Sequence, residues 1–419
     1  MRYDIVIIGA GLVGQSLAAA LASGNPALTV ALIDPALATP PDLPPELLPA
    51  LPDLAASGLD SFDLRVSALT ARSQHLLTAI GAWQWIRPAR RQPYTHMTVW
   101  DAEGTGEVNF DAADLHVPCL GHIIENRETL AGLRQRLTAC PAVTLITQPV
   151  RYLDSRRADG LTPVVLERGS GQDSGGQRDT LLASLVVGAD GAHSRVRQWV
   201  GLPTSEWDYQ HQALVATVST EQPMAATAWQ RFRPQGPLAL LPMPTNPRLA
   251  SIVWSTSDTE ANTLMALDNA DFCTALSAAF EQRLGAITAC SPRVAIPLRQ
   301  RHARRYWQDG VVLAGDAAHT IHPLAGQGVN LGFKDVEVLA EEILAAVARG
   351  ISPGHDQVLA RYQRRRQLDN LATMAAMEGF KRLFAADAPL IRLLRNSGMT
   401  QFDRLLPVKQ HAMMQAMGL

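Results

Sequence analysis

The sequence predicts an α/β protein with an N-terminal parallel-sheet domain, a separate region of antiparallel sheet and a helical C-terminal region. First, the N-terminal run YDIVIIGAG is typical of a buried strand, and LVGQSLAAALASG continues it as a helix ending in Gly24. Second, residues 212–297 contain short β-forming runs, with one amphipathic helix at about 270–284. Third, apolar residues recur at helical spacing beyond Arg361.

Length, charge and cysteine usage narrow the class of protein. A chain of 419 residues is long enough for two or three packed domains. A net charge of -2 gives no whole-chain field that would favour nucleic acid. Four widely spaced cysteines without a CxxC pair indicate neither a zinc site nor a disulfide framework, which favours a reducing cytosol. The apolar run 5–22 divides into the strand and helix above, so we expect no membrane span.

A glycine motif lies between the first strand and the first helix. Gly9, Gly11 and Gly14 form GxGxxG, and the run LTVALID ends in Asp34 twenty residues later. In this context the first glycine permits the tight turn, the second admits a pyrophosphate and the third lets the helix pack on the strand. The helix N-terminus offers free N–H groups to the phosphates, and the acid suits ribose hydroxyls. A dinucleotide site is therefore favoured over a merely structural turn.

Two arginines stand at predicted element boundaries. After the proline-rich excursion 35–52, to which we assign no role, Arg65 precedes a predicted helix at about 68–80. Arg127 lies where LGHIIENRETLAGLRQRL changes from strand to helix. Arg65 is either a solvated arginine or a contact to a cofactor's pyrophosphate.

A second glycine motif, GADG at 188–191, follows the strand LLASLVV. It places Asp190 where a sharp turn meets the start of a basic helix. A helix cap would be an ordinary use of this aspartate.

The third motif, GDAAHTIHPLAGQGVNLG at 315–332, could suggest a metal site or a catalytic dyad. His319 and His322 are three residues apart, but Pro323 favours extended geometry at His322, and no cysteine or close acidic cluster completes a metal shell. No GxSxG elbow supports a hydrolase. The glycines favour backbone N–H groups brought close to a ligand, with a helix from about Asn330.

Together the motifs GxGxxG, GADG and GDAAH resemble those of the class A flavoprotein aromatic hydroxylases of the p-hydroxybenzoate hydroxylase fold. The runs DLRVSALTARSQHLLTAIGAW, MTVWDAEGTGEVNFDA, LGHIIENR and AAHTIHPLAGQGVNLG are similar to the ubiquinone-biosynthesis hydroxylases. The tail RLFAADAPLIRLLRNSGMTQFDRLLPVKQHAMMQAMGL is similar to theirs as well. The resemblance covers nearly the whole chain.

The resemblance implies a Rossmann-like FAD-binding domain interleaved with an antiparallel-sheet substrate domain and followed by a helical C-terminal region. The FAD-binding domain would comprise residues 1–82, 118–202 and 299–350. The substrate domain would comprise residues 83–117 and 203–298, and the helical region residues 351–419.

The resemblance also implies roles for individual residues. Gly9, Gly11 and Gly14 would hold the ADP part of FAD, with Asp34 on its ribose, although the family more often has glutamate there. Arg65 and Arg127 would contact the phosphates and ribose region, and Asp190 would lie near the pyrophosphate. The GDAAH and glycine segments would hold the ribityl chain and the flavin N1–C2=O edge, through Gly315, Asp316, Gly328, Val329 and Asn330. Pro323 and His322 would line the active site; the residues that act as acid or base, if any, are not identified, and no metal is implied.

The implied activity is hydroxylation of a polyprenylated phenol or benzoquinol in ubiquinone biosynthesis, at C5 or C6, through a C4a-hydroperoxyflavin. NAD(P)H would be a transient co-substrate beside O₂, because the chain has only one strand-linked GxGxxG. The alternatives are a hydroxylase of a soluble phenol or a flavin-binding module without turnover. We expect a cytoplasmic homo-oligomer that binds no nucleic acid and meets partner proteins of the pathway.

The C-terminal region suggests contact with the inner face of a membrane. Residues 361–419 contain ten basic residues against four acidic ones. Apolar residues are interspersed, many at helical spacing. A helical cap with a wet basic face is the ordinary interpretation. Because a polyprenyl phenol is nearly insoluble, we also expect weak, salt-sensitive attachment to an anionic lipid surface.

Overall fold

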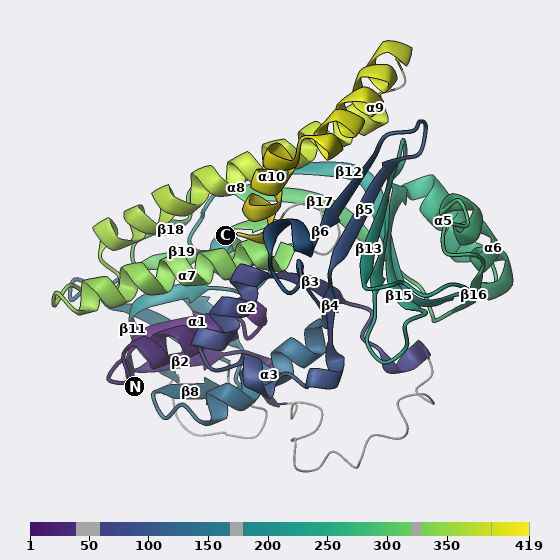
Figure 1. Cartoon of the computed structure of the whole chain (residues 1–419). Helices are drawn as coiled ribbons and strands as arrows, with labels where there is room; N and C mark the ends of the chain where they lie inside the picture. The colour runs from purple at the N-terminus through teal and green to yellow at the C-terminus, as the bar shows by residue number, and fades with distance from the viewer. Residues whose placement is uncertain (39–58, 168–178, 321–327, 387, 419) are drawn as a thin grey trace.

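A computed structural model of the chain describes residues 1–38, 59–167, 179–320, 328–386 and 388–418. Two large sheets lie side by side, and a long helix crosses from one to the other (Figure 1). The predicted α/β class and the helical C-terminal region are both confirmed.

The first sheet has the strand order of a dinucleotide-binding fold. Five parallel strands lie in the order β8 (Val143–Ile146), β2 (Val30–Ile33), β1 (Arg2–Ile8), β11 (Thr180–Gly188) and β19 (Val311–Leu313). In chain order this is 3-2-1-4-5, the doubly wound arrangement. Antiparallel strands extend it: β18 (Trp307–Gln308), β10 (Thr162–Leu166) and β9 (Val150–Leu153).

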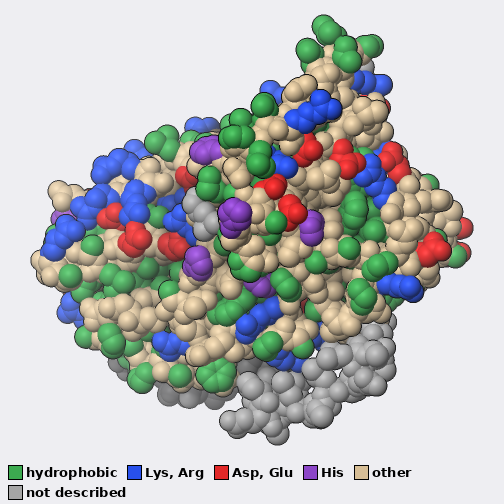
Figure 2. Space-filling model, in the orientation of Figure 1, with side chains coloured by type: hydrophobic (Ala, Val, Ile, Leu, Met, Phe, Trp, Pro, Cys, Tyr) green, Lys and Arg blue, Asp and Glu red, His purple; other side chains and the backbone are tan. Residues whose placement is uncertain are grey.

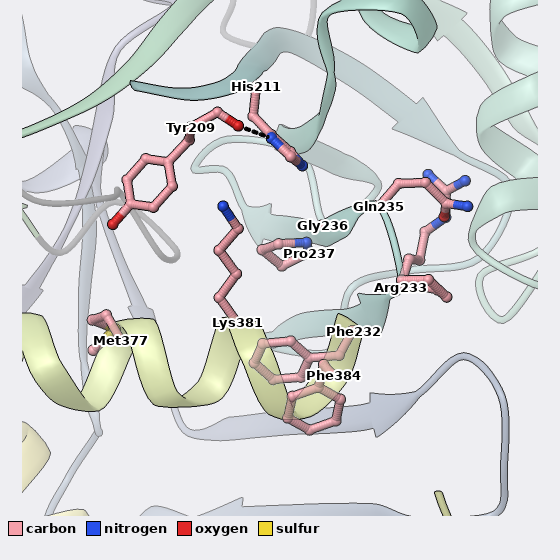
Figure 3. Close-up of a pocket in the computed structure, with 11 residues that line it drawn as sticks. Tyr209, His211, Phe232, Arg233, Gln235, Gly236, Pro237, Met377, Lys381 and Phe384 are labelled. Carbon is pink, nitrogen blue, oxygen red and sulfur yellow. Dashed lines mark hydrogen bonds between the residues drawn. The ribbon is translucent and has the colours of Figure 1, made fainter. Parts of the chain in front are cut away.

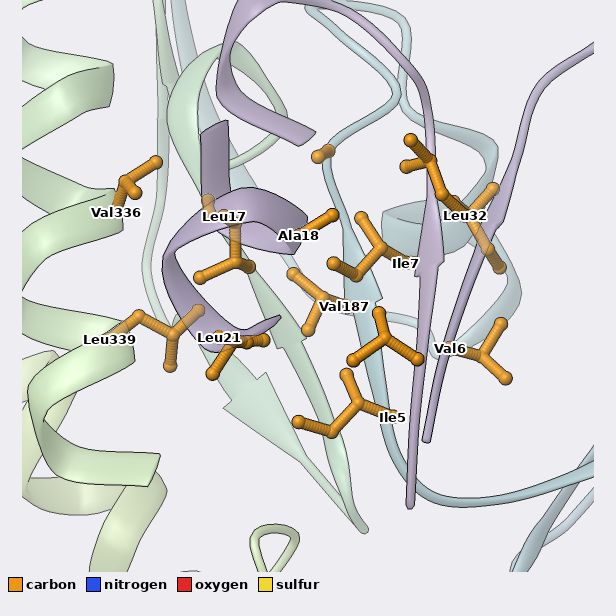
Figure 4. Packing of buried hydrophobic residues seen from close by; sticks show 14 of the residues in the cluster. Ile5, Val6, Ile7, Leu17, Ala18, Leu21, Leu32, Val187, Val336 and Leu339 are labelled. Carbon is orange, nitrogen blue, oxygen red and sulfur yellow. The ribbon is translucent and has the colours of Figure 1, made fainter. Parts of the chain in front are cut away.

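Helices α1 (Leu12–Gly24), α3 (Asn126–Thr138) and α7 (Gly328–Val347) pack around this sheet. Figure 4 shows Leu17 and Leu21 of α1 between β1 and α7, whose Leu339 faces them. Strand β1 is buried on both faces, which explains its continuous apolar sequence.

The second sheet is mostly antiparallel. Its main order is β20 (His319–Thr320), β17 (Val294–Ala303), β12 (Thr204–Thr220), β15 (Leu249–Ser257), β14 (Gly236–Pro242), β13 (Thr227–Arg233), β5 (His96–Asp101) and β6 (Glu107–Asp111). Strand β16 (Ile287–Cys290) also pairs with β12. Helices α5 (Asp258–Ala266) and α6 (Asn269–Ala279) lie against it, over a core that includes Trp254 and Phe272.

A small three-stranded sheet joins the two large ones. Strands β3 (Val66–Thr70), β7 (Gly121–Glu125) and β4 (Arg91–Tyr94) pair in that order, and helix α2 (Ala71–Ala79) follows β3. Elsewhere in the described chain, short 3₁₀ helices lie in connections at 35–38, 59–61, 83–85, 88–90, 112–115 and 315–317. Helix α4 (Arg195–Trp199) follows the second glycine motif.

Three long helices end the chain. Helix α8 (Asp356–Ala385) packs on α7 and reaches the second sheet, where Phe384 stacks on Phe232 at 4.0 Å between ring centroids. Helices α9 (Pro389–Arg404) and α10 (Leu406–Met417) then fold back, so that the α8–α9 junction projects from the body (Figure 1).

Three local expectations need correction. The predicted helix at 68–80 begins only at Ala71, because residues 66–70 form β3 and the Thr70 hydroxyl caps the helix. Region 212–297 holds helix α5 as well as the expected α6, and its first strand begins at Thr204. Helix α7 begins at Gly328, two residues before the predicted start. The six-segment domain division stays a prediction; within 83–117, β4 pairs with β7, whereas β5 and β6 join the second sheet.

Candidate cofactor and substrate site

A cavity of about 1160 Å³ opens at the carboxyl ends of β1, β2, β11 and β19. Ligands bind at this edge in open α/β sheets. All three glycine motifs line it, through Gly9, Gly11, Asp190, Asp316 and Gly328. Motifs more than 300 residues apart in the sequence therefore meet at one site.

The first motif shows a different use for each glycine. Gly9 has φ +106°, and a Cβ there would lie 2.3 Å from the Ala189 carbonyl oxygen. A Cβ on Gly14 would lie 1.9 Å from the Gly9 oxygen, so helix α1 could not approach β1 so closely. A Cβ on Gly11 would have no atom within 4 Å. Gly11 thus leaves the N-terminus of α1 open to the cavity, as a phosphate chain requires.

Asp34 lines the cavity and also braces the glycine loop. Its Oδ2 accepts a hydrogen bond from the Ala10 N–H at 2.8 Å, and its Oδ1 accepts one from the Ala36 N–H at 2.8 Å. Each carboxylate oxygen can accept a second hydrogen bond, so Asp34 can still accept one from a ribose hydroxyl, as predicted.

Arg65 and Arg127 lie together on the cavity wall because Asp63 holds both backbones. The Asp63 carboxylate accepts from the Arg65 N–H at 3.0 Å and from the Arg127 N–H at 3.1 Å. The Arg127 guanidinium is 2.8 Å from Glu125, whereas Arg65 forms no ion pair with any described residue. Sequence reasoning missed Asp63, since nothing in its local pattern marks it.

Glu125 supports this wall from within. Burial raises the pKa of its carboxyl, and the Asp63 N–H at 2.6 Å together with Arg90 and Arg127 only partly offset that effect. Its side chain is fully buried, and both arginines lie within 3.0 Å of it.

Asp190 helps to cap helix α4, as the ordinary interpretation of its motif expected, although Ser194 occupies the N-cap position and only one Asp190 oxygen takes part. Oδ2 accepts from the Arg195 N–H at 2.7 Å and the Val196 N–H at 3.1 Å. Oδ1 is buried and has no hydrogen-bond partner among the described residues. The residue lines the cavity, so a ligand hydroxyl or an ordered water would satisfy this oxygen.

The third motif is a tight turn. Gly315 has φ +62°, lies outside the cavity lining and places Asp316 in it. Asp316 is open to the cavity yet enclosed by protein, and burial raises the pKa of its carboxyl; His319 and Arg65 oppose that effect, whereas Asp335 adds to it. His319 is buried, and its Nε2 lies 2.5 Å from Asp335 Oδ2. His322 and Pro323 lie outside the described residues.

The start of helix α7 closes one side of the cavity. Gly328, Val329 and Gly332 line it, and the N–H groups of the first turn have no partner within the helix. Asn330 points away: its Oδ1 accepts from Ser73 Oγ at 2.6 Å, and its Nδ2 donates to the Ala68 oxygen at 2.8 Å. Its side chain therefore fixes α7 to the three-stranded sheet.

The opposite wall belongs to the second sheet. Ile296, Pro297 and Leu298 of β17 line the same cavity, with Arg299 and Arg301 beside them. Arg301 is held by Glu206, with 2.5 Å between Nε and Oε1. These residues were also missed, because nothing in a short β run shows which residues face the glycine motifs.

A second cavity is much smaller. It measures about 30 Å³ and lies between β12, the β13–β14 turn and α8, where Tyr209, His211 and Lys381 meet the Phe232–Phe384 stack (Figure 3). That volume suits one or two water molecules, not an aromatic ring.

The large cavity fits a dinucleotide on three grounds. The two crowded glycines and the open Gly11 form a phosphate cradle at a helix N-terminus. Its volume exceeds the roughly 300–1,000 Å³ typical of small-molecule pockets, which leaves room for a second ligand. Its β17 wall includes three consecutive apolar residues, Ile296, Pro297 and Leu298, beside Arg299 and Arg301.

Comparison with known proteins supports this assignment. Residues 58–376 match the FAD binding domain family. The chain is 37% identical to the 3-demethoxyubiquinol 3-hydroxylase of Escherichia coli, covering 99% of this chain and 98% of the relative. It is 36% identical to the ubiquinone hydroxylase UbiL of Rhodospirillum rubrum, covering 99% and 89%. It is 33% identical to the human ubiquinone biosynthesis monooxygenase COQ6, covering 98% and 92%.

Solved structures agree on the fold. The p-nitrophenol 4-monooxygenase PnpA of Pseudomonas putida superposes with a TM-score of 0.73 at 18% identity, covering 98% of this chain and 96% of that one. PqsL of Pseudomonas aeruginosa gives 0.72 at 21% identity, covering 96% and 100%. The resemblance inferred from the three motifs is confirmed, and the chain belongs to the family of FAD-dependent hydroxylases of ubiquinone biosynthesis.

Proposed function

We propose that this protein uses FAD, NAD(P)H and O₂ to hydroxylate the aromatic ring of a polyprenylated phenol or benzoquinol at C5 or C6. The observation that supports it most is that one cavity runs from the glycine loop of the parallel sheet to apolar residues of β17. A dinucleotide on the first wall would bring its reactive end to a ring held on the second.

The proposed cofactor contacts follow the cavity. Gly11 and the α1 N-terminus would take the pyrophosphate, with Arg65 as the nearby cation that no described acid neutralises. Asp34 would accept from the ribose and Asp316 from the ribityl hydroxyls. Arg127 would act with Arg65, and Asp190 through its free oxygen.

The start of α7 would serve the flavin ring. N–H groups of Gly328, Val329 and Asn330 would face the N1–C2=O edge, where the positive end of a helix stabilises negative charge. Bound FAD supplies the redox chemistry, taking electrons from NAD(P)H and activating O₂. His322 and Pro323 remain proposed lining residues.

The protein's own part in the reaction is to hold the ring and exclude water. Ile296, Pro297 and Leu298 present apolar surface where a ring would lie. Exclusion of water protects reactive intermediates from hydrolysis. The prenyl chain would add apolar contact that a soluble phenol lacks.

One assay separates the alternatives. The purified protein should be yellow, and a prenylated phenol should increase its NAD(P)H oxidation and yield a product one oxygen heavier. NMR of that product would identify the carbon. Stimulation only by short soluble phenols would replace the proposed substrate class, and bound FAD without stimulated turnover would favour the non-catalytic module.

We further propose peripheral attachment to the inner face of the membrane, a homo-oligomer and contacts with other proteins of the pathway. No described helix combines the length and apolarity needed to cross a bilayer. Support for attachment comes from exposed side chains near the α8–α9 junction, among them Phe380, Leu390, Leu393 and Leu394.

A further inference from the structure

A fully buried aspartate lies directly behind the Gly315–Asp316 turn. Asp335 of α7 is 0% exposed. Its Oδ2 accepts from the Gly315 N–H at 2.9 Å and lies 2.5 Å from His319 Nε2. Its Oδ1 accepts from Arg366 Nε of helix α8 at 2.7 Å. One carboxylate thus joins the turn, strand β20, helix α7 and helix α8.

The electrostatics keep this carboxylate ionised. Burial alone would raise its pKa, but His319 and Arg366 outweigh burial and lower the pKa of Asp335 to about 2. An ionised carboxylate only accepts hydrogen bonds, so His319 Nε2 carries the proton and donates it. Every contact of Asp335 is therefore a donor aimed at a fixed negative charge.

A second layer of buried groups holds Arg366. Its Nη2 donates to Asn370 Oδ1 at 2.5 Å, and Asn370 Nδ2 donates to the Tyr306 hydroxyl at 3.1 Å. His302 Nε2 lies 3.0 Å from the same hydroxyl. The network reaches β17 through His302, five residues from the apolar wall residue Pro297.

The turn itself has little free space. A Cβ on Gly315 would lie 2.8 Å from Val13 of α1, and one on Gly332 of α7 would lie 2.6 Å from the same side chain. The direction of Asp316 therefore depends on how α7 holds the turn, and the Gly315 N–H bond to Asp335 is the direct link.

We propose that Asp335 is a positioning residue for the cofactor: with His319 and Arg366 it holds the Gly315–Asp316 turn in its binding shape and couples helix α8 to FAD affinity. The proposal rests on the FAD site described above. It does not require Asp335 to touch FAD, since the residue lies outside the cavity lining.

The test compares two buried carboxylates. Asp335→Asn keeps the shape but turns an amide N–H toward donors. Asp101→Asn is the matched control: Asp101 of β5 is 2% exposed and bound by Arg395 of α9 at 2.7 and 2.9 Å, outside the cavity lining. Both changes remove a buried, paired charge, so both should lower the unfolding temperature.

FAD affinity distinguishes them. On serial dilution of each holoprotein, free FAD fluorescence should show an affinity about ten- to a hundredfold lower for Asp335→Asn, the loss expected for a charged hydrogen bond. It should be unchanged for Asp101→Asn. The visible circular dichroism of bound flavin should change only in the first variant.

Unchanged FAD affinity in Asp335→Asn would overturn the proposal, and so would an equal loss in both variants, which would indicate general destabilisation. If Asp335→Asn does not fold, Arg366→Lys keeps the charge and should weaken FAD several-fold. Wild-type FAD affinity in Arg366→Lys would rule out the coupling to α8. A parent protein that binds FAD without hydroxylating a prenylphenol would refute the proposed function and leave this test intact.

Discussion

Single atoms decide the roles of the glycines in the first motif, and two substitutions separate them. Gly11→Asp adds a negative charge at an open cavity wall, so the protein should fold but purify without yellow FAD. Gly14→Ala places a methyl group against the Gly9 oxygen, so the apoprotein should unfold at a lower temperature. Absorbance at 450 nm and thermal unfolding report the two effects. A yellow Gly11→Asp protein would contradict the phosphate assignment.

The Asp316 carboxylate has opposite effects on the two properties: it lowers the stability of the apoprotein and would strengthen FAD binding. Because its folded-state pKa is raised, the ionised carboxyl costs folding free energy that is absent below its ordinary pKa and appears as pH rises through the raised value. Asp316→Ala should therefore leave the apoprotein at least as stable at pH 7, with a smaller difference in acid. Its FAD affinity should fall about ten- to a hundredfold, for a lost bond of roughly 1.5–3 kcal/mol. Unfolding of the variant would show that Asp316 is needed only for the turn.

At the scale of elements, Asn330 locks the start of α7 to β3 and α2. Asn330→Ala leaves the Ser73 hydroxyl and the Ala68 oxygen without this partner, at a cost of about 1–3 kcal/mol. Urea unfolding of the apoprotein measures that cost, and FAD affinity should fall with it because the helix start moves. Ser73→Ala removes one of the contacts and should cost less. If Asn330→Ala is as stable as the parent protein, these hydrogen bonds do not hold the start of α7 in place.

The sequence predicted the elements whose signals are local. Strand, glycine turn and helix at 2–24 could be identified because each residue type there reflects its own backbone and burial. Asp335 and Asp63 could not, since their partners lie on other elements, up to 64 residues away. The apolar residues of β17 that line the cavity could not be assigned either. Tertiary packing decides which side chains of one sheet face the other, and a short β run does not show this.

At the scale of the whole molecule, the site exists because the chain passes repeatedly between two sheets. Parallel pairing of β13 with β5 brings residues from 96–101 and 227–233 into one sheet (Figure 1), and β20, which follows the third glycine motif's turn, pairs with β17 of the same sheet. The cavity is lined by residues of both large sheets, so its two walls come from segments far apart in the chain.

The C-terminal helices give the molecule an exposed apolar end. Figure 2 shows hydrophobic side chains gathered where the α8–α9 junction projects. Leu390, Leu393 and Leu394 are each more than 60% exposed. The basic surface expected from the sequence needs correction, since most of those bases are paired. Arg392 meets Glu103, Arg395 meets Asp101, and Lys409 meets Asp114.

That pairing changes the expected mode of attachment. With few free positive charges, binding to a lipid surface should depend on burial of the leucines and only weakly on salt, contrary to the salt-sensitive attachment inferred from composition. Flotation with anionic liposomes should carry the parent protein at low and moderate salt. A variant with Leu390, Leu393 and Leu394 changed to Glu should remain in the lipid-free fraction, while Leu368→Glu, which changes an even more exposed leucine on α8, should float. If the parent does not float and light scattering shows an oligomer that the triple variant loses, this apolar end joins copies of the chain and does not bind lipid.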